Sequence, residues 1–141
     1  MHEKDCIFCK IAAGELPSAK VYEDNHVLAF MDIGQVTKGH TLIIPKTHTK
    51  NIYETPPEVA QEVFSRVPQI ANAIKEAFNP AGLNVLSNTE AAAGQTVFHL
   101  HVHLIPRYGK NDGFHATFEQ HDNVASEHLG ELAEKISSKI Q

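Results

Sequence analysis

The sequence has no tryptophan, only two cysteines and only two arginines among its 141 residues. Two cysteines cannot build the disulfide framework of a small secreted domain, and 42% hydrophobic residues supply one core without such cross-links. The apolar runs are only a few residues long, which excludes a membrane-spanning helix. The polar start, Met1 to Asp5, is not typical of a secretory signal peptide. We therefore expect a single intracellular domain over residues 1–141, located in the cytoplasm.

Positive charge is also scarce. Lysine and arginine number 12 against 17 acidic residues, which gives a formal net charge of −5. Proteins that follow a nucleic-acid backbone need a basic patch, so we predict no nucleic-acid partner and no membrane partner. Backbone N–H groups at a helix N-terminus can still hold one phosphate. Histidine, by contrast, is abundant, with ten residues whose ordinary pKa near neutrality suits proton transfer, metal binding or nucleophilic attack.

The hydrophobic pattern predicts five strands and three helices. The strands are expected at 21–23, 26–31, 41–45, 83–86 and 97–105, and the helices at 6–13, 55–78 and about 126–140. In the long helix, Thr55 and Glu58 have the spacing of a capping box, and Pro68 should introduce a kink. Ser126 is the expected cap of the last helix. Consecutive strands joined by short turns predict an α+β fold, with a five-stranded antiparallel sheet, one long kinked helix and a C-terminal helix.

The segment from His99 to Ile105 alternates histidine with apolar residues. On a strand this places three imidazoles on one face, while Leu100, Val102 and Leu104 enter the core. His101 is the central histidine. The Cα atoms of the outer two, His99 and His103, would lie roughly 13 Å apart, so no small group can touch all three side chains equally. Two other interpretations fit the residues: an exposed strand with polar histidines, or a hydrolase that holds its metal through the H-x-H spacing.

This alternation is similar to the signature of the histidine triad family of nucleotide hydrolases and transferases, in particular its Hint-like and bacterial members. Further matching segments are Ile7–Ile11, Leu28–Ile33, Gly39–Lys46, Asn88 and Gly94–Phe98. The resemblance implies an enzyme that attacks the α-phosphorus of a purine nucleotide conjugate, such as a nucleoside phosphoramidate, through a covalent nucleotidyl-histidine. It also implies a homodimer and no organic cofactor. An open sheet edge and surplus apolar residues on the long helix, such as Phe64, agree with a dimer.

The matching positions imply individual roles. His101 corresponds to the nucleophile, with His103 and His40 as the other catalytic residues. Asp32 corresponds to the carboxylate that binds the ribose hydroxyls, which is sound hydrogen-bond chemistry. The phosphate is expected at His103, Asn88, Gly94, Gln95 and Thr96, and the base in an apolar slot made by Ile7, Phe8, Ile11, Leu16 and Ile33. The slot residues fit an ordinary core equally well.

Two departures from the family pattern leave the leaving group open. The loop reads Asn88-Thr89-Glu90, and no tryptophan-bearing tail follows the triad. The arginine that follows the triad, Arg107, is instead similar to the pattern of the family branch that cleaves dinucleoside polyphosphates. Hydrolysis of a dinucleoside polyphosphate is therefore an alternative, as is a nucleotide-binding interaction module with negligible turnover.

Cys6 and Cys9 form a C-x-x-C pair. With His48 and His99 they make a Cys₂His₂ set, which tetrahedral zinc accepts. The resemblance supports this grouping, and we expect the zinc to be structural. A redox dithiol lacks the usual βαβ setting, and two inert cysteines are the remaining interpretation.

Overall fold

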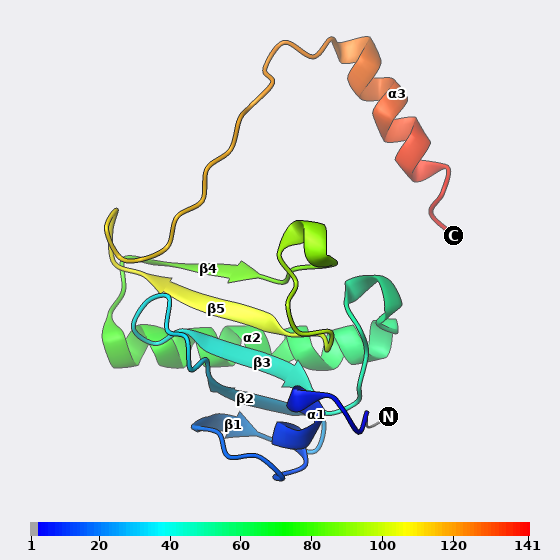
Figure 1. Ribbon diagram of the computed structural model, residues 1–141. Coiled ribbons are helices and arrows are strands. Elements are labelled where there is room, and N and C mark those ends of the chain that lie inside the picture. Colours follow the sequence, from blue (N-terminus) through cyan, green and yellow to red (C-terminus); the bar gives the residue numbers. More distant parts are fainter. Residues whose placement is uncertain (1–2) are drawn as a thin grey trace.

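The computed structural model describes residues 3–141 and contains a five-stranded antiparallel sheet with the strand order β1-β2-β3-β5-β4 (Figure 1). The strands are β1 (Lys20–Glu23), β2 (Val27–Met31), β3 (Thr41–Pro45), β4 (Gly82–Leu86) and β5 (Val102–Arg107). The helices are α1 (Ile7–Ala12), α2 (Pro57–Phe78) and α3 (Ser126–Ser137), with short 3₁₀ turns η1 (Ile52–Glu54) and η2 (Ala91–Ala93). The predicted α+β class and five antiparallel strands are confirmed.

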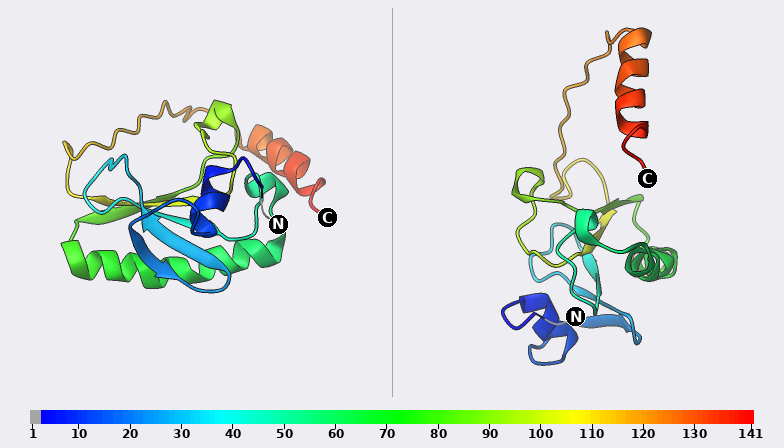
Figure 2. Two further views of the ribbon diagram at one scale, coloured as in Figure 1. Left: turned by 60° about the horizontal axis from the view of Figure 1, so that its bottom comes forward. Right: turned by 90° about the vertical axis from the view of Figure 1, so that its right-hand side faces the viewer.

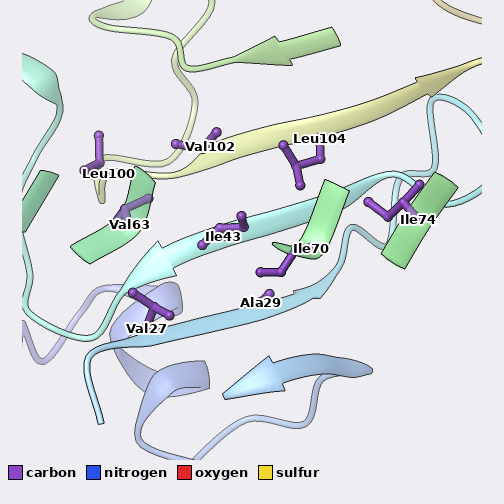
Figure 3. Close-up of a cluster of buried hydrophobic side chains, with 9 residues drawn as sticks. All are labelled: Val27, Ala29, Ile43, Val63, Ile70, Ile74, Leu100, Val102 and Leu104. Atoms are coloured by element: carbon purple, nitrogen blue, oxygen red, sulfur yellow. The ribbon is translucent and has the colours of Figure 1, made fainter. Parts of the chain in front are cut away.

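The two faces of the sheet carry different cores. Odd-numbered residues of the central strands, Ala29 and Ile43, pack beneath α2 with Val63, Ile70 and Leu104 in a cluster of fully buried side chains (Figure 3). Even-numbered residues of the same strands face away from α2, because successive side chains alternate across a strand. They form a second cluster with α1, made of Phe8, Ile11, Leu28, Phe30, Leu42 and Ile44. The functional pocket described below opens on this second face.

The triad strand differs from the prediction of 97–105. β5 begins only at Val102, because the Leu100 amide donates to the Thr49 carbonyl at 2.7 Å and thus to a loop instead of a strand. The strand also continues through Pro106 to Arg107. Pairing with β3 ends where Thr41 meets Leu104, so the missing N–H of Pro106 leaves no bond unmade on that side.

The helix ends also require corrections. Thr55 forms no capping box: Pro56 is the N-cap residue of α2, and the Thr55 hydroxyl donates instead to the Asn51 carbonyl at 2.7 Å. Ser126 does not cap α3, since Ala125 is the N-cap residue and Ser126 lies in the first turn. α3 ends at Ser137, before the predicted limit near residue 140. α2 continues through Pro68 without interruption (Figure 1), as the predicted helix over 55–78 requires, and the kink at this proline stays a prediction.

The C-terminal part stands away from the sheet. From Tyr108 the chain runs as a long extended arm that ends in α3, beyond the β4 edge in all views (Figures 1 and 2). Every residue from 115 to 141 is exposed. Over residues 3–141, no helix has both the length and the apolar character that crossing a membrane would need.

Candidate active site

A hollow of about 560 Å³ lies on the face of the sheet opposite α2, between α1, the ends of β2 and β3, and the loop that precedes the triad. Its walls are apolar on the α1 side and polar on the triad side. It is lined by Ile7, Phe8, Ile11, Leu16, Pro17, Ser18, Ala19, Phe30, Met31, Asp32, Ile33, Leu42, Asn88, Gly94, Thr96, Val97, His101 and His103.

His101 presents an unprotonated nitrogen at this pocket. Its Nδ1 lies 2.7 Å from the main-chain oxygen of His99, and a carbonyl oxygen can only accept, so Nδ1 carries the proton. The lone pair of the neutral ring is therefore on Nε2. Burial lowers the pKa of His101, which keeps the ring neutral near pH 7. The edge of Phe8 packs against the ring with centroids 5.1 Å apart and holds its orientation.

His103 presents an N–H donor to the pocket, because its neighbour His40 fixes which ring nitrogen carries the proton. The Val36 amide donates to His40 Nδ1 at 3.3 Å, so the proton of a neutral His40 is on Nε2. That Nε2 lies 2.9 Å from His103 Nδ1 and donates to it, which places the His103 proton on Nε2. Burial lowers the pKa of both rings, that of His103 to about 4, so both are neutral at pH 7. The pocket thus receives one imidazole acceptor and one imidazole donor.

Asp32 lines the pocket at the end of β2. Its Oδ1 accepts from the Gly34 amide at 2.8 Å, and its Oδ2 lies 3.6 Å from His40 Nε2. The side chain is 23% exposed, so the carboxylate is held in position and remains open to a ligand. His40 itself is buried behind His103 and does not line the pocket.

Most of the other predicted binding residues also line this pocket. Ile7, Phe8, Ile11, Leu16 and Ile33 form its apolar part, and Asn88, Gly94 and Thr96 its polar rim. Residues that the sequence analysis missed include Phe30, Leu42 and the run Pro17–Ala19. Phe30 lies on β2, two positions before Asp32, which follows the strand directly, so strand alternation was a signal for its place in the pocket.

Gln95 does not reach the pocket with its side chain, and its contact with the phosphate stays a prediction. Its side chain is buried and does not line the pocket. Its amide nitrogen donates to the Lys50 and Val97 carbonyls at 2.8 and 3.0 Å, and its oxygen accepts from the Glu90 amide at 2.8 Å. The structure assigns Gln95 to holding the loop that carries Asn88 and Gly94.

Arg107 does not reach the pocket either. Its Nε donates to Asp112 at 2.8 Å, its Nη1 donates to Asn84 at 2.8 Å, and its guanidinium lies over the Phe114 ring. The contacts with Asp112 and Phe114 tie β5 to the beginning of the C-terminal arm, and the bond to Asn84 ties it to β4. Arg107 therefore gives no structural support to the dinucleoside polyphosphate alternative.

The four predicted metal ligands do come together. Cys6, Cys9, His48 and His99 each offer one atom, and the four atoms lie within 4.8 Å of one another. His99 Nδ1 is 3.3 Å from Cys6 Sγ, 3.5 Å from Cys9 Sγ and 3.2 Å from His48 Nδ1. Ligand atoms of tetrahedral zinc lie roughly 3.3–3.8 Å apart, given bond lengths of about 2.0–2.3 Å.

His99 has the protonation that a metal ligand needs, whereas burial raises the pKa of the Cys9 thiol, which a metal would have to deprotonate. His99 Nε2 lies 2.8 Å from the Pro45 carbonyl and donates to it, so the Nδ1 lone pair faces the thiols. Burial lowers the pKa of His99 to about 4. The Cys9 amide donates to Cys6 Sγ at 3.3 Å, as suits a thiolate. None of the four residues lines the pocket, so a metal here would lie outside the candidate active site.

A model of the HIT domain matches residues 13–110. The chain belongs to the HIT family. The protein named Protein hit from Bacillus subtilis is 56% identical over 138 residues, which cover 97% of this chain and 95% of that one. A crystal structure of a HIT family protein from Bacillus anthracis superposes with a TM-score of 0.95 at 56% identity, covering 98% of this chain and 99% of that chain.

Two other HIT relatives have more informative names. The adenylylsulfatase HINT3 of Arabidopsis thaliana is 49% identical over 105 residues, which are 74% of this chain and 53% of that protein. A histidine triad nucleotide-binding protein from Candida albicans has a crystal structure with a TM-score of 0.86 at 33% identity, covering 96% of each chain. These names describe a nucleotide-processing enzyme and a nucleotide-binding protein.

Proposed function

We propose that this HIT protein hydrolyses or transfers the nucleotidyl group of a purine nucleotide conjugate, with a nucleoside phosphoramidate as the preferred substrate class. The observation that carries the proposal is the hydrogen bond from His101 Nδ1 to the His99 carbonyl. It leaves an unprotonated Nε2 at the pocket, and a neutral imidazole is a sufficient nucleophile without a separate general base.

The reaction takes place in two steps. In the first, His101 Nε2 attacks the α-phosphorus. A P–N bond forms, and the bond to the leaving group breaks. The leaving group takes its electron pair and a proton from solvent. The Nε2–H of His103 donates to the phosphate oxygens, where negative charge develops. In the second step water attacks the same phosphorus and gives up one proton to solvent. The P–N bond breaks with its electron pair returning to His101 Nε2, and a nucleoside monophosphate leaves. His40 and Asp32 act through His103 by keeping its donor tautomer.

Different walls of the pocket suit different parts of the nucleotide. The apolar slot beside α1 suits a planar base, because Phe8 and Phe30 offer ring surfaces and Ile7 is 49% exposed at the pocket. Asp32 accepts from the ribose hydroxyls. Asn88 and Thr96 offer polar groups to the phosphate, and the Gly94 backbone, at φ +97°, has no side chain to obstruct it.

We also propose that Cys6, Cys9, His48 and His99 hold one structural zinc ion. When bound, the ion would cross-link the N-terminal turn to the segments that flank β3 and precede β5. The four residues supply two thiolates and two neutral imidazoles, which suit zinc in charge and in chemistry. No step of the proposed reaction uses this ion.

The test is product identification with a substrate panel. The panel holds adenosine and guanosine phosphoramidates, dinucleoside polyphosphates and adenylyl sulfate, the last because of the plant relative. We expect nucleoside monophosphate from the phosphoramidates at the highest kcat/KM. Faster cleavage of the dinucleotides would favour the polyphosphate alternative, and binding without even a single turnover would favour an interaction module. Immediate loss of activity on chelation, with the fold intact, would favour a metal hydrolase.

A further inference from the structure

One residue of the loop before the triad has a backbone conformation that is almost exclusive to glycine. Glu90 has φ +72° and ψ 158°, where a side chain crowds its own backbone. Such a strained residue persists only where its surroundings over-determine the conformation, and strained residues cluster at functional sites. Glu90 lies in the loop that leads from β4 back to β5 (Figure 1), and it does not itself line the pocket. Any effect of Glu90 on the pocket is therefore indirect.

The backbone of Glu90 is part of a closed loop, which we call the 88–96 loop. The Glu90 amide donates to Gln95 Oε1 at 2.8 Å, and the Glu90 carbonyl accepts from the Gln95 amide at 3.1 Å. On the pocket side, Asn88 Nδ2 lies 3.5 Å from the Gly94 carbonyl. These bonds make the loop one unit. It brings Asn88, Gly94 and Thr96 to the pocket together.

The side chain of Glu90 fastens this unit to the segment between β3 and η1. Its Oε1 accepts from Asn51 Nδ2 at 3.3 Å and from Lys50 Nζ at 3.4 Å. Asn51 is 1% exposed, and its Oδ1 accepts from the Tyr53 amide, which directs its Nδ2 toward Glu90. The Lys50 and Glu90 side chains are 43% and 45% exposed, and an exposed ion pair contributes little. The bond to the buried Asn51 is therefore the main anchor of the carboxylate.

We infer that Glu90 is a positioning residue for phosphate binding: its anchored carboxylate holds the 88–96 loop in the conformation that presents Asn88 and Thr96 to the pocket. Glycine at this position would permit the conformation without enforcing it, and an unanchored residue with a Cβ would leave it. The phosphate would then meet a competent loop only part of the time, and its apparent affinity would fall by that fraction. This inference rests on the proposed function in one respect, namely that the pocket binds a nucleotide.

The charge of Glu90, acting alone, predicts an effect of the opposite sign. A carboxylate near a phosphate site repels the phosphate, so removing the charge should strengthen phosphate binding. Removing a positioning residue should weaken it. The direction of the change in affinity therefore distinguishes an anchor from a mere surface charge.

The test compares adenosine monophosphate with adenosine, which lacks only the phosphate. Calorimetry gives both Kd values, and the ratio of the adenosine Kd to the monophosphate Kd isolates the phosphate contribution. We expect Glu90→Ala to lower this ratio about tenfold with the adenosine Kd unchanged, as for a loop that is competent in one molecule in ten. Glu90→Gly should lower the ratio less, because glycine relieves the strain. Glu90→Gln keeps an oxygen that can accept from Asn51, so it should retain at least the wild-type ratio.

Glu54→Ala is the matched control, since Glu54 is an exposed carboxylate of η1 outside the pocket, and both Kd values should stay near those of the wild type. Melting temperatures monitor the fold. Glu90→Gly should melt above Glu90→Ala, because only alanine keeps the strain, and the reverse order would overturn the inference. An equal affinity of the wild type for both ligands, a ratio that Glu90→Ala leaves unchanged or raises, or an equal loss in Glu90→Gln would also overturn it. The ratio requires no turnover, so it decides the role of Glu90 separately from the substrate panel.

Discussion

Replacing His101 with alanine should abolish turnover while nucleotide binding persists. The structure offers no substitute nucleophile of the same kind. The His103 Nε2 that faces the pocket carries the proton of this ring, so it has no lone pair with which to attack. The His103 Nδ1 is also occupied by His40. Loss of the covalent route should lower kcat by about 10⁴-fold or more, the range seen when a catalytic nucleophile is removed.

Binding should survive because its parts are separate from the attacking nitrogen. Asp32 is held by the Gly34 amide, and Phe8 of the apolar slot keeps its packing on Phe30 when its contact with the His101 ring is lost. Calorimetry with a nucleoside monophosphate should therefore give a dissociation constant within about tenfold of the wild-type value. His26→Ala is the matched control, since this histidine has a side chain that is 55% exposed and lies outside the pocket.

Rapid quench with a ³²P-labelled phosphoramidate provides the decisive assay. Wild-type protein should carry label on His101 alone within the first turnover, and His101→Ala should carry none. His103→Ala should retain partial activity and still form the labelled intermediate, because His103 donates to the phosphate and is not attacked. Label on His103, or near wild-type turnover by His101→Ala, would refute the reasoning from tautomers.

Three further predictions concern zinc, pH and the ribose. Cys6→Ala should remove about one zinc per chain, as measured by metal analysis. It should lower the melting temperature more than it lowers turnover at a temperature where the fold survives. A metal-free protein of equal stability would refute a structural role for the zinc. In the folded protein the pKa of His103 is about 4, against an ordinary value of 6.5. Between these two pH values the unfolded chain therefore binds more protons than the folded one. The free energy of unfolding should fall by about 2 kcal/mol as the pH drops from 6.5 to 4. Melting curves of His103→Gln should show a smaller decline, and an equal decline would contradict this assignment. Asp32→Asn should raise KM about tenfold for ribonucleotide conjugates and little for 2′-deoxy analogues; equal effects on both would exclude ribose binding.

The faces of the triad were predictable although its strand limits were not. Alternation of histidine with Leu100, Val102 and Leu104 persists in the fold: the three apolar residues lie in the cluster beneath α2, and His101 and His103 line the pocket. The start of β5 depends on which segment lies alongside. The amide of Leu100 donates to the Thr49 carbonyl in a loop instead of to a strand, and no residue near position 100 in the sequence indicates that hydrogen bond.

Bonds to distant partners were the ones that the sequence did not indicate. Gln95 matches a phosphate-binding position, and its side chain bonds to Lys50 and Asn51, more than forty residues earlier in the chain. Thr55 had the spacing of a capping box, but the turn before α2 offered it the Asn51 carbonyl instead. A local motif predicts a local bond only when no better partner arrives from elsewhere in the fold.

The protonation states of the site depend on backbone carbonyls that no side-chain motif specifies. His99 connects the metal-ligand cluster to the nucleophile, since its ring faces the two cysteines while its main-chain oxygen fixes the Nδ1 proton of His101. The Pro45 carbonyl orients the His99 ring in turn. Anything that secures the His99 ring therefore also secures the carbonyl that selects the reactive tautomer of His101.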